Sequence, residues 1–340
     1  MKKKNIIVIG ASAGGMEVLK RLFSRLSPTI DAAIFITWHM SADVRGLLPY
    51  VLAKENSLHV ANAIDGESIK FNRAYVAPPD HHLLIENEVV RVVRGPKENR
   101  FRPAIDPLFR SAAYSYGPRV IGIVLTGALD DGTAGLWTIK QFGGTTIVQD
   151  PAESAYPSMP RSAIRHVEID YKLPVTEMAP LLTRLADEEI IETREPVDDE
   201  KAKAQREVKI ALMEEEDDKG IPGLTTPYAC PDCHGVLSLV RDGGIVRFRC
   251  HTGHGFSADT LLSILSENIE NSIWNAIRGL EECIFLLNSM GDHYAAINQP
   301  KEAGMFFKKA KQMEARSKAL RHAVLKNERL SNDNIISASG

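Results

Sequence analysis

A serine follows the first apolar run of the chain in a setting that suits a nucleophile. Gly10-Ala-Ser-Ala-Gly14 comes directly after the apolar residues 6–9, and an amphipathic helical pattern begins at Gly15. A G-x-S-x-G turn between a strand and a helix lifts the serine hydroxyl above the carboxyl edge of a sheet. Two other interpretations fit the same residues. One is a dinucleotide-binding loop, although Ser12 stands where its fingerprint needs glycine, and the other is a tight turn of small residues.

A histidine and a pair of aspartates occupy the corresponding place after two further apolar runs. His39 ends the run 34–38, and Asp130 and Asp131 follow the run 120–125. A serine nucleophile needs a base, and the base needs a carboxylate to orient it. His39 alone would suit a structural role, and the aspartates alone would suit a helix cap. Three polar groups at three strand ends together indicate a Ser-His-Asp triad, because α/β sheets place their sites at the carboxyl ends of strands.

Three cysteines and a histidine in the second half of the chain have the spacing of zinc ligands. Cys230 and Cys233 form C-x₂-C, and Cys250 and His254 form C-x₃-H. Two such pairs on facing turns suit a tetrahedral structural Zn²⁺. Asp-Gly-Gly at 242–244, between two apolar runs, predicts a β-hairpin that joins the pairs. The pattern resembles a zinc ribbon.

The metal interpretation leaves alternatives open. His251 and His234 lie beside the proposed ligands and are alternatives for the fourth place. A redox C-x-x-C is the competing interpretation, and no thioredoxin-like βαβ pattern surrounds it. Cys283 falls close to the apolar face of a helical pattern, so we expect a packing role for it. Because so small a segment lacks a core of its own, a bound metal would contribute much of its stability.

The first 190 residues must supply the sheet that positions the proposed triad. Short β-branched runs alternate there with amphipathic stretches, which predicts an α/β domain with a largely parallel sheet and flanking helices. The expected strands cover residues 5–9, 33–37, 73–76, 82–85, 90–94, 120–125 and 145–149. The expected helices cover residues 15–26, 47–55, 107–116 and 134–142.

Composition changes beyond this domain. Between positions 187 and 219, fourteen acidic residues face six basic ones, which predicts a solvated linker with a helical part over 200–216. Two long helical patterns end the chain, and their apolar seam is open to self-association. We therefore assign the chain to a first domain (1–190), an acidic linker (191–223), a zinc-ribbon-like module (224–257), an α-helical hairpin (258–330) and a frayed tail (331–340).

The overall composition excludes several classes of protein. Hydrophobic residues make up 44% and charged residues 25% of the 340, which is typical of soluble globular chains. A net charge of −3 argues against a nucleic-acid partner, and four cysteines exclude a disulfide scaffold. No apolar run is long enough for a secretory signal or for membrane insertion. We expect a cytoplasmic protein, where thiols stay reduced.

Six ordered motifs resemble the catalytic domain of the bacterial chemotaxis protein-glutamate methylesterases, the CheB type. They are Ile9-Gly-Ala-Ser-Ala-Gly-Gly15, Trp38-His-Met40, Tyr75-Val-Ala-Pro-Pro-Asp-His-His-Leu83, Arg102-Pro-Ala-Ile-Asp-Pro-Leu-Phe109, Leu125-Thr-Gly-Ala-Leu-Asp-Asp-Gly132 and Met159-Pro160. The resemblance covers about residues 5–190, and the order of the motifs makes it specific. It implies a carboxylic ester hydrolase that converts glutamyl γ-methyl esters of chemoreceptors to glutamate and methanol. It leaves deamidation of receptor glutamines open as a second activity.

The resemblance also implies which residues act. The family motifs fall on Ser12, His39 and Asp131, since the family's aspartate immediately precedes a glycine. Backbone N–H groups of Ala13 and Ala128 are the candidate oxyanion donors. A serine triad needs no cofactor, so we expect catalysis without metal, and hydrolysis by residues 1–190 alone.

Two departures from the family stand out. Such enzymes often carry an N-terminal receiver domain, and the motifs here begin near residue 6, so we expect none within this chain. Trp38 stands where the family often has a polar residue, which we expect to alter substrate fit. The alternative function is a non-catalytic signalling adaptor that combines a methylesterase-like fold with a zinc module. The complete triad favours the enzyme.

Overall fold

The computed structural model describes residues 3–40, 46–190, 196–214 and 223–326, together with residues 330 and 335. The chain divides into two compact units, Met1–Thr260 and Leu261–Gly340. Most of the predicted tail and parts of the predicted linker (191–195 and 215–222) lie outside the described residues. Within the described part of the chain, every helix is too short or too polar to cross a bilayer.

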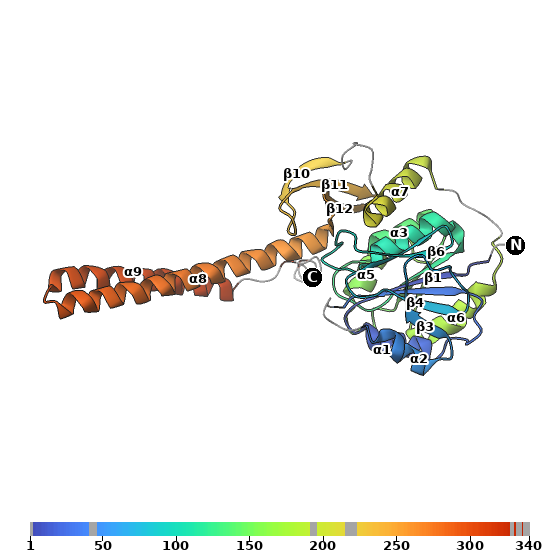
Figure 1. Cartoon of the computed structure of the whole chain (residues 1–340), viewed down its shortest axis with the longest axis horizontal. Coiled ribbons are helices and arrows are strands. Elements are labelled where there is room, and N and C mark those ends of the chain that lie inside the picture. Colours follow the sequence, from blue (N-terminus) through green and yellow to red (C-terminus); the bar gives the residue numbers. More distant parts are fainter. Residues whose placement is uncertain are drawn as a thin grey trace. The chain divides into compact units, whose positions relative to one another are not determined.

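A seven-stranded parallel sheet forms the centre of the first unit, with the strand order β3-β4-β2-β1-β7-β8-β9 (Figure 1). The predicted α/β fold with a parallel sheet is therefore confirmed. The chain adds strands on one side of β1 first and on the other side later, so the order reverses beside β1. The strands are β1 (Ile6–Ala11), β2 (Ala33–Trp38), β3 (His59–Asn62), β4 (Arg73–Val76), β7 (Val120–Val124), β8 (Thr145–Gln149) and β9 (Tyr171–Leu173).

Helices cover both faces of this sheet, because its central strands are apolar on both sides (Figure 1). In β1, Ile7 and Ile9 pack into one layer, and Ile6 and Val8 pack into the other, as the alternation of a strand requires. The first layer holds α1 (Gly15–Phe23), α2 (Leu48–Glu55) and α6 (Val175–Asp187). The second holds α3 (Ile105–Tyr116), α4 (Thr133–Gln141) and α5 (Ser158–His166).

Two smaller sheets complete the first unit. The hairpin of β5 (His82–Glu86) and β6 (Val89–Val93) packs on α3. A four-stranded antiparallel sheet contains β10 (Leu224–Ala229), β11 (Val236–Asp242), β12 (Ile245–Cys250) and β13 (Gly255–Ser257). The hairpin predicted around 242–244 corresponds to β11 and β12.

Helix α7 (Asp198–Leu212) departs from the solvated linker predicted for this region. It packs against α3 and buries Ala204, Val208 and the carboxylate of Glu207. That carboxylate lies 3.2 Å from Arg247 and forms a second ion pair with Arg249, both on β12. The stretch around this helix is acidic in composition, but Glu207 of the helix is a buried partner of arginines rather than a solvated charge.

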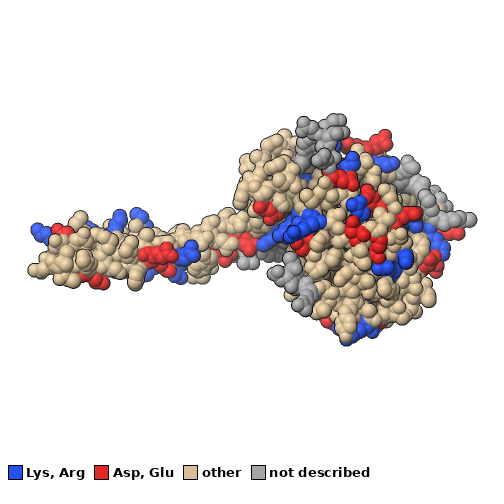
Figure 2. Space-filling view, viewed as in Figure 1, with Lys and Arg blue, Asp and Glu red and all other residues tan. Residues whose placement is uncertain are grey.

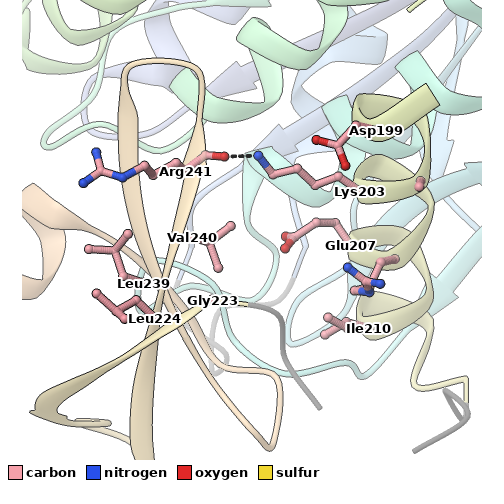
Figure 3. Close-up of a pocket in the computed structure, with 11 residues that line it drawn as sticks. Asp199, Lys203, Glu207, Ile210, Gly223, Leu224, Leu239, Val240 and Arg241 are labelled. Carbon is pink, nitrogen blue, oxygen red and sulfur yellow. Dashed lines mark hydrogen bonds between the residues drawn. The ribbon is translucent and has the colours of Figure 1, made fainter. Parts of the chain in front are cut away.

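The same helix lines a cavity with the antiparallel sheet. Figure 3 shows Lys203 and Glu207 pointing from α7 towards β11, and the Lys203 ammonium donates to the Arg241 carbonyl. Leu239 and Val240 of β11 line the cavity, whose volume is about 490 Å³. Helix α7 and the sheet therefore contact each other through ion pairs around a hollow rather than through a continuous apolar seam.

The second unit contains α8 (Ala258–Ala296) from Leu261 onward and the whole of α9 (Pro300–Leu325). These are the two helices predicted there. The rings of Tyr294 and Phe306 stack with centroids 5.1 Å apart where the helices meet. Several apolar side chains stay exposed, among them Phe285 and Met305. Figure 2 shows uncharged side chains over much of the visible face of these helices.

Candidate active site

The proposed nucleophile lies directly after β1, at the place where the strand order reverses. Its backbone N–H donates to the Thr126 carbonyl across the sheet edge, at 3.0 Å. Gly14 then takes φ 75°, a left-handed conformation that glycine adopts without strain, and α1 begins. A Cβ on Gly127 would lie 2.8 Å from the Cβ of Ser12, so only glycine permits this close approach of the β7 loop.

The structure joins the three predicted triad residues in one hydrogen-bonded series. The Ser12 hydroxyl lies 3.1 Å from Nδ1 of His39, and Nε2 of the same ring lies 2.7 Å from a carboxylate oxygen of Asp131. The three residues follow β1, β2 and β7, which are neighbours in the sheet. Nδ1 can therefore accept the serine proton while Nε2–H donates to the carboxylate. The serine proteases use the two ring nitrogens the other way round.

Asp131 is buried, and several donors stabilise its charge. Besides His39, the backbone N–H of Ile105 donates to it at 2.7 Å, from the first turn of α3. The side-chain amide of Asn99 donates to its other oxygen at 2.9 Å. Burial alone would raise the pKa of Asp131, but the hydrogen bonds and charge of His39, together with those two donors, hold it below its usual value. The carboxylate is thus ionised where the imidazole needs it.

The neighbouring Asp130 does not contact His39 in this way. One of its oxygens accepts hydrogen bonds from the hydroxyls of Ser257, at 2.6 Å, and Thr260, at 3.2 Å. The structure therefore places Asp131, and not Asp130, against the imidazole, and it gives Asp130 a different partner on the antiparallel sheet.

Two aromatic side chains contact the residues of the proposed triad. Phe101 stacks on the His39 imidazole with ring centroids 3.7 Å apart and planes 12° apart. The indole N–H of Trp38 donates to the carbonyl of Ser12 at 2.9 Å. Trp38, where the family often has a polar residue, therefore stabilises the backbone of the turn that carries Ser12.

A cavity of about 530 Å³ opens at the serine. Lys97, Arg100 and Arg102 contribute cationic groups to it, and Arg102 is paired with Asp80 at 2.7 Å. Of the two oxyanion candidates, Ala13 lines this cavity, whereas Ala128 is exposed and does not appear among its described lining residues. The described lining comprises Ser12, Ala13, His39, Met40, Asp80, Lys97, Arg100, Phe101 and Arg102.

The four predicted metal ligands also cluster. The donor atoms of Cys230, Cys233, Cys250 and His254 all lie within 4.8 Å of one another. The two thiols of Cys233 and Cys250 are 3.6 Å apart, and His254 Nδ1 is 3.5 Å from the Cys250 sulphur. The alternatives His251 and His234 are not in this group of described residues. We call these four residues the Cys₃His cluster, and their arrangement could hold a metal ion.

Sequence reasoning missed three residues that hold the triad: Asn99, Phe101 and Thr126. Asn99 and Phe101 stand just before the Arg102 motif, but nothing local marks their partners. Thr126 lies inside the motif that led to Asp131. Its hydroxyl donates to the Ala13 carbonyl at 3.1 Å, which fixes the residue after the nucleophile.

Comparison with known proteins gives matches to the first half of the chain. The model of the CheB methylesterase family matches residues 7–182. A protein of Leptospira interrogans named putative protein-glutamate methylesterase/protein-glutamine glutaminase is 40% identical over 180 residues, covering 53% of this chain and 93% of that protein. A protein of Anaeromyxobacter dehalogenans, named protein-glutamate methylesterase/protein-glutamine glutaminase 2, is 38% identical, and the match covers 53% of each chain. The crystal structure of the Thermotoga maritima CheB methylesterase catalytic domain aligns with a TM-score of 0.51 and 34% identity, covering 53% of this chain and 98% of that one.

Proposed function

The chain belongs to the CheB methylesterase family, and we propose that it hydrolyses glutamate γ-methyl esters of chemoreceptors through Ser12, His39 and Asp131. The single observation that carries the proposal is the unbroken series of hydrogen bonds from the serine hydroxyl through the imidazole to the carboxylate. Such a series is what a serine nucleophile needs for activation. The products are glutamate and methanol.

The geometry supports a two-step mechanism. Nδ1 of His39 takes the proton as the Ser12 oxygen attacks the ester carbonyl, and Asp131 stabilises the resulting imidazolium. The same Nδ1 returns the proton to the methoxide, so methanol leaves and a glutamyl ester of Ser12 remains. A water molecule then attacks this ester as His39 takes one of its protons, and the imidazolium returns that proton to the Ser12 oxygen as glutamate leaves. Attack on a glutamine side chain would give the same acyl-enzyme with loss of ammonia, in keeping with the paired names of the relatives.

The groups around the serine fit this substrate. The Ala13 N–H, next to the nucleophile, is the oxyanion donor that we favour, and Ala128 remains a candidate for the second donor. Lys97 and Arg100 line the same cavity, and their positive charge suits a receptor segment rich in carboxylates.

We further propose that the Cys₃His cluster binds a structural Zn²⁺. Bonds of about 2.3 Å to sulphur and about 2.0–2.1 Å to nitrogen place tetrahedral ligand atoms about 3.5–3.8 Å apart. Three of the six separations among these atoms, at 3.5, 3.6 and 3.8 Å, fit that figure, and all six lie within 4.8 Å. The ion would tie the turn at Cys230 and Cys233 to the loop after β12. Thiolate ligands also favour a cytoplasmic location, where they stay reduced.

Self-association through α8 and α9 is part of the proposal. Phe285 is 77% exposed, Met305 73% and Leu286 60%, which is unusual for apolar side chains on paired helices. A second copy of these helices would cover them in a four-helix arrangement.

The test of the activity is methanol release from a receptor peptide that carries a glutamate γ-methyl ester. We expect Ser12→Ala to lower turnover by roughly 10⁴-fold or more, because the triad acts as a unit. Ser24→Ala is the matched control, since this serine is exposed at the end of α1. Circular dichroism checks that both variants fold. A wild-type chain that binds methylated receptor without hydrolysing it would favour the adaptor instead.

A further inference from the structure

A tight turn lies between the triad and the antiparallel sheet. Glu98 and Phe101 exchange both of their backbone hydrogen bonds, at 3.2 and 2.8 Å. The two residues between them, Asn99 and Arg100, have φ values of 49° and 76°. Positive φ at both central positions defines a type I′ turn, in which asparagine is favoured at the first position. We call residues 98–101 the Asn99 turn.

One side of the Asn99 turn contacts two members of the triad. The Nδ2 amide of Asn99 donates to Asp131 at 2.9 Å, and Phe101 stacks on His39. Asn99 itself is 3% exposed, so water cannot easily replace its hydrogen bonds. The turn therefore fixes both the carboxylate and the plane of the imidazole.

The other side of the Asn99 turn contacts β13. The Asn99 N–H donates to the Gly255 carbonyl at 2.8 Å, and the Ser257 N–H donates to the Asn99 side-chain oxygen at 2.8 Å. Glu98 next to it pairs with Arg249 at 2.8 Å. Arg249 and Gly255 are the immediate neighbours in sequence of Cys250 and His254, two members of the Cys₃His cluster.

The ends of the loop that carries the turn are anchored separately. Nε2 of His82 lies 2.8 Å from the Pro96 carbonyl, and the Ala104 N–H donates to Nδ1 of the same ring at 3.2 Å. The ring is therefore neutral with its proton on Nε2, and burial lowers its pKa. His82 belongs to the first domain, so the base of the loop stays fixed without the antiparallel sheet. The tip, by contrast, is held on one side by Asp131 and Arg110 of the first domain and on the other by β13.

We propose that Asn99 is a positioning residue for the triad, and that its turn makes the geometry of Asp131 and His39 depend on the state of the Cys₃His cluster. The inference rests on the proposed function of the triad. A single planar amide links the two sites: its nitrogen holds Asp131, and its oxygen is held by β13. A displacement of β13 must therefore rotate or shift the donor that Asp131 uses. Removing the metal from a small site of this kind disorders its ligand loops, and β13 begins one residue after a ligand.

The first test separates positioning from folding in the full-length chain. Asn99→Gly keeps the positive φ and removes the amide, and Asn87→Gly is the matched control. Asn87 has φ 45° at the first central position of the β5–β6 turn, away from the site. For Asn99→Gly we expect kcat on the methyl-ester peptide to fall roughly 10- to 100-fold, with KM changed less than about twofold. The control should match wild type.

Two further measurements, both of activity against pH, would match wild type if Asn99 contributed only to stability. Asp131 faces His39, Asp106 and Asp130, and Asn99 is a donor that lowers its pKa, so Asn99→Gly should shift the acid limb of the pH profile upward. Asn99→Asp keeps an acceptor for the Ser257 N–H, but it can donate to Asp131 only while the new carboxyl is protonated. Its kcat should therefore fall relative to wild type as pH rises and the new carboxyl ionises. A pH profile of Asn99→Asp that parallels wild type, or an unshifted profile in Asn99→Gly, would overturn the positioning role.

The second test concerns the cluster. Zinc is removed from the wild-type chain with a chelator and then restored, with metal content measured by elemental analysis. We expect faster amide hydrogen exchange at both 97–101 and 255–257 after removal, lower kcat, and recovery of both on addition of Zn²⁺. In Asn99→Gly, removal should lower kcat much less, because the link is already broken. A chain that takes up no zinc would refute the dependence of the triad on the Cys₃His cluster. So would a chain that loses its zinc while kcat and amide exchange at 97–101 stay unchanged. If the wild-type chain hydrolyses no ester at all, the proposed function fails, and the exchange data still decide this inference.

Discussion

Two neighbouring buried carboxyl groups, Asp131 and Asp106, differ in their charge. Asp131 is surrounded by donors, and its pKa is lowered. Asp106 lies next to it and accepts hydrogen bonds from the Gly135 N–H at 2.7 Å and from Asn99 at 3.3 Å. Burial and the charge of Asp131 raise the pKa of Asp106 to about 8. Near neutral pH, therefore, one carboxyl serves the imidazole as an anion while its neighbour stays protonated.

This difference predicts opposite effects for two equivalent substitutions. Asp131→Asn should lower kcat roughly 10⁴-fold, as expected when the orienting carboxylate of a triad is lost. Asp106→Asn imitates the protonated acid and should keep kcat within about threefold at neutral pH. Methanol release measures both. Equal losses in the two variants would contradict the assignment of charge.

The raised pKa of Asp106 also predicts a pH dependence of stability. A carboxyl whose pKa is higher in the folded chain contributes its full stability below its unfolded pKa, and loses it as pH rises towards about 8. The free energy of unfolding of wild type should therefore fall relative to Asp106→Asn over that interval, by up to about 1.4 kcal/mol per pH unit. Urea unfolding of both chains at several pH values measures the difference. Parallel curves would count against a protonated Asp106.

At this scale the sequence predicts the triad but not the residues that hold it. Ser12, His39 and Asp131 each end an apolar run, and parallel strands bring such ends to one edge. Asn99 ends no such run, and its partner Ser257 stands 158 positions later. A hydrogen bond over that separation depends on how the antiparallel sheet docks, which no local pattern records.

Among the elements, α7 shows how composition alone misleads. The acidic stretch 187–219 in which it lies predicts a solvated helix, but Glu207 is 6% exposed and paired with arginines of β12. Arg247 and Arg249 stand two positions apart on that strand, so their side chains share one face. Two arginines on one face of a buried strand need an anionic partner, but the burial of this strand is visible only in the structure. Strand β3 was missed for another reason, since its sequence His-Val-Ala-Asn lacks an apolar run.

The ion pairs of Glu207 predict a large cost for its loss. Glu207→Ala leaves Arg247 and Arg249 with fewer anionic partners in a buried site, which typically costs about 3–5 kcal/mol. The exposed Asp198 at the start of the same helix is the control, and Asp198→Asn should change stability by less than about 0.5 kcal/mol. Urea unfolding measures both. A Glu207→Ala chain as stable as the control would mean that the docking of α7 does not depend on these pairs.

For the whole molecule, the packing of α7 and the antiparallel sheet leads us to propose an active unit that extends beyond residue 190. The sequence alone predicts that residues 1–190 hydrolyse esters independently. In the structure, α7 covers Leu84 and Tyr114 of the first domain with Val208 and Leu212. Arg110 of α3 pairs with Glu98 and lies 3.7 Å from Glu207. A shorter chain would expose these apolar groups and leave the Arg110 charge partly unpaired.

Two truncations test this extent. A chain ending at residue 190 should unfold at lower temperature and lose at least about tenfold in kcat, since the partners of the Asn99 turn are missing. A chain ending at residue 270 keeps the first unit and the start of α8, and should hydrolyse the ester within about twofold of wild type. Light scattering on the second chain also reports whether self-association requires the remaining helices. Equal activity and stability in the two truncations would show that residues 1–190 are sufficient for hydrolysis.

The contacts between β13 and Asn99 come from the main chain of Gly255 and Ser257. Every residue except proline carries these peptide groups. The hydrogen bonds to Asn99 therefore do not themselves depend on side-chain identity; the constraints on sequence here come from elsewhere, since a side chain at Gly255 would press on Arg249 and the Ser257 hydroxyl bonds Asp130. A change in chain length cannot be absorbed in the same way. One residue inserted or deleted between His254 and Ser257 would present the wrong peptide groups to that amide, so relatives that carry this module should conserve the length of this interval more strictly than its sequence.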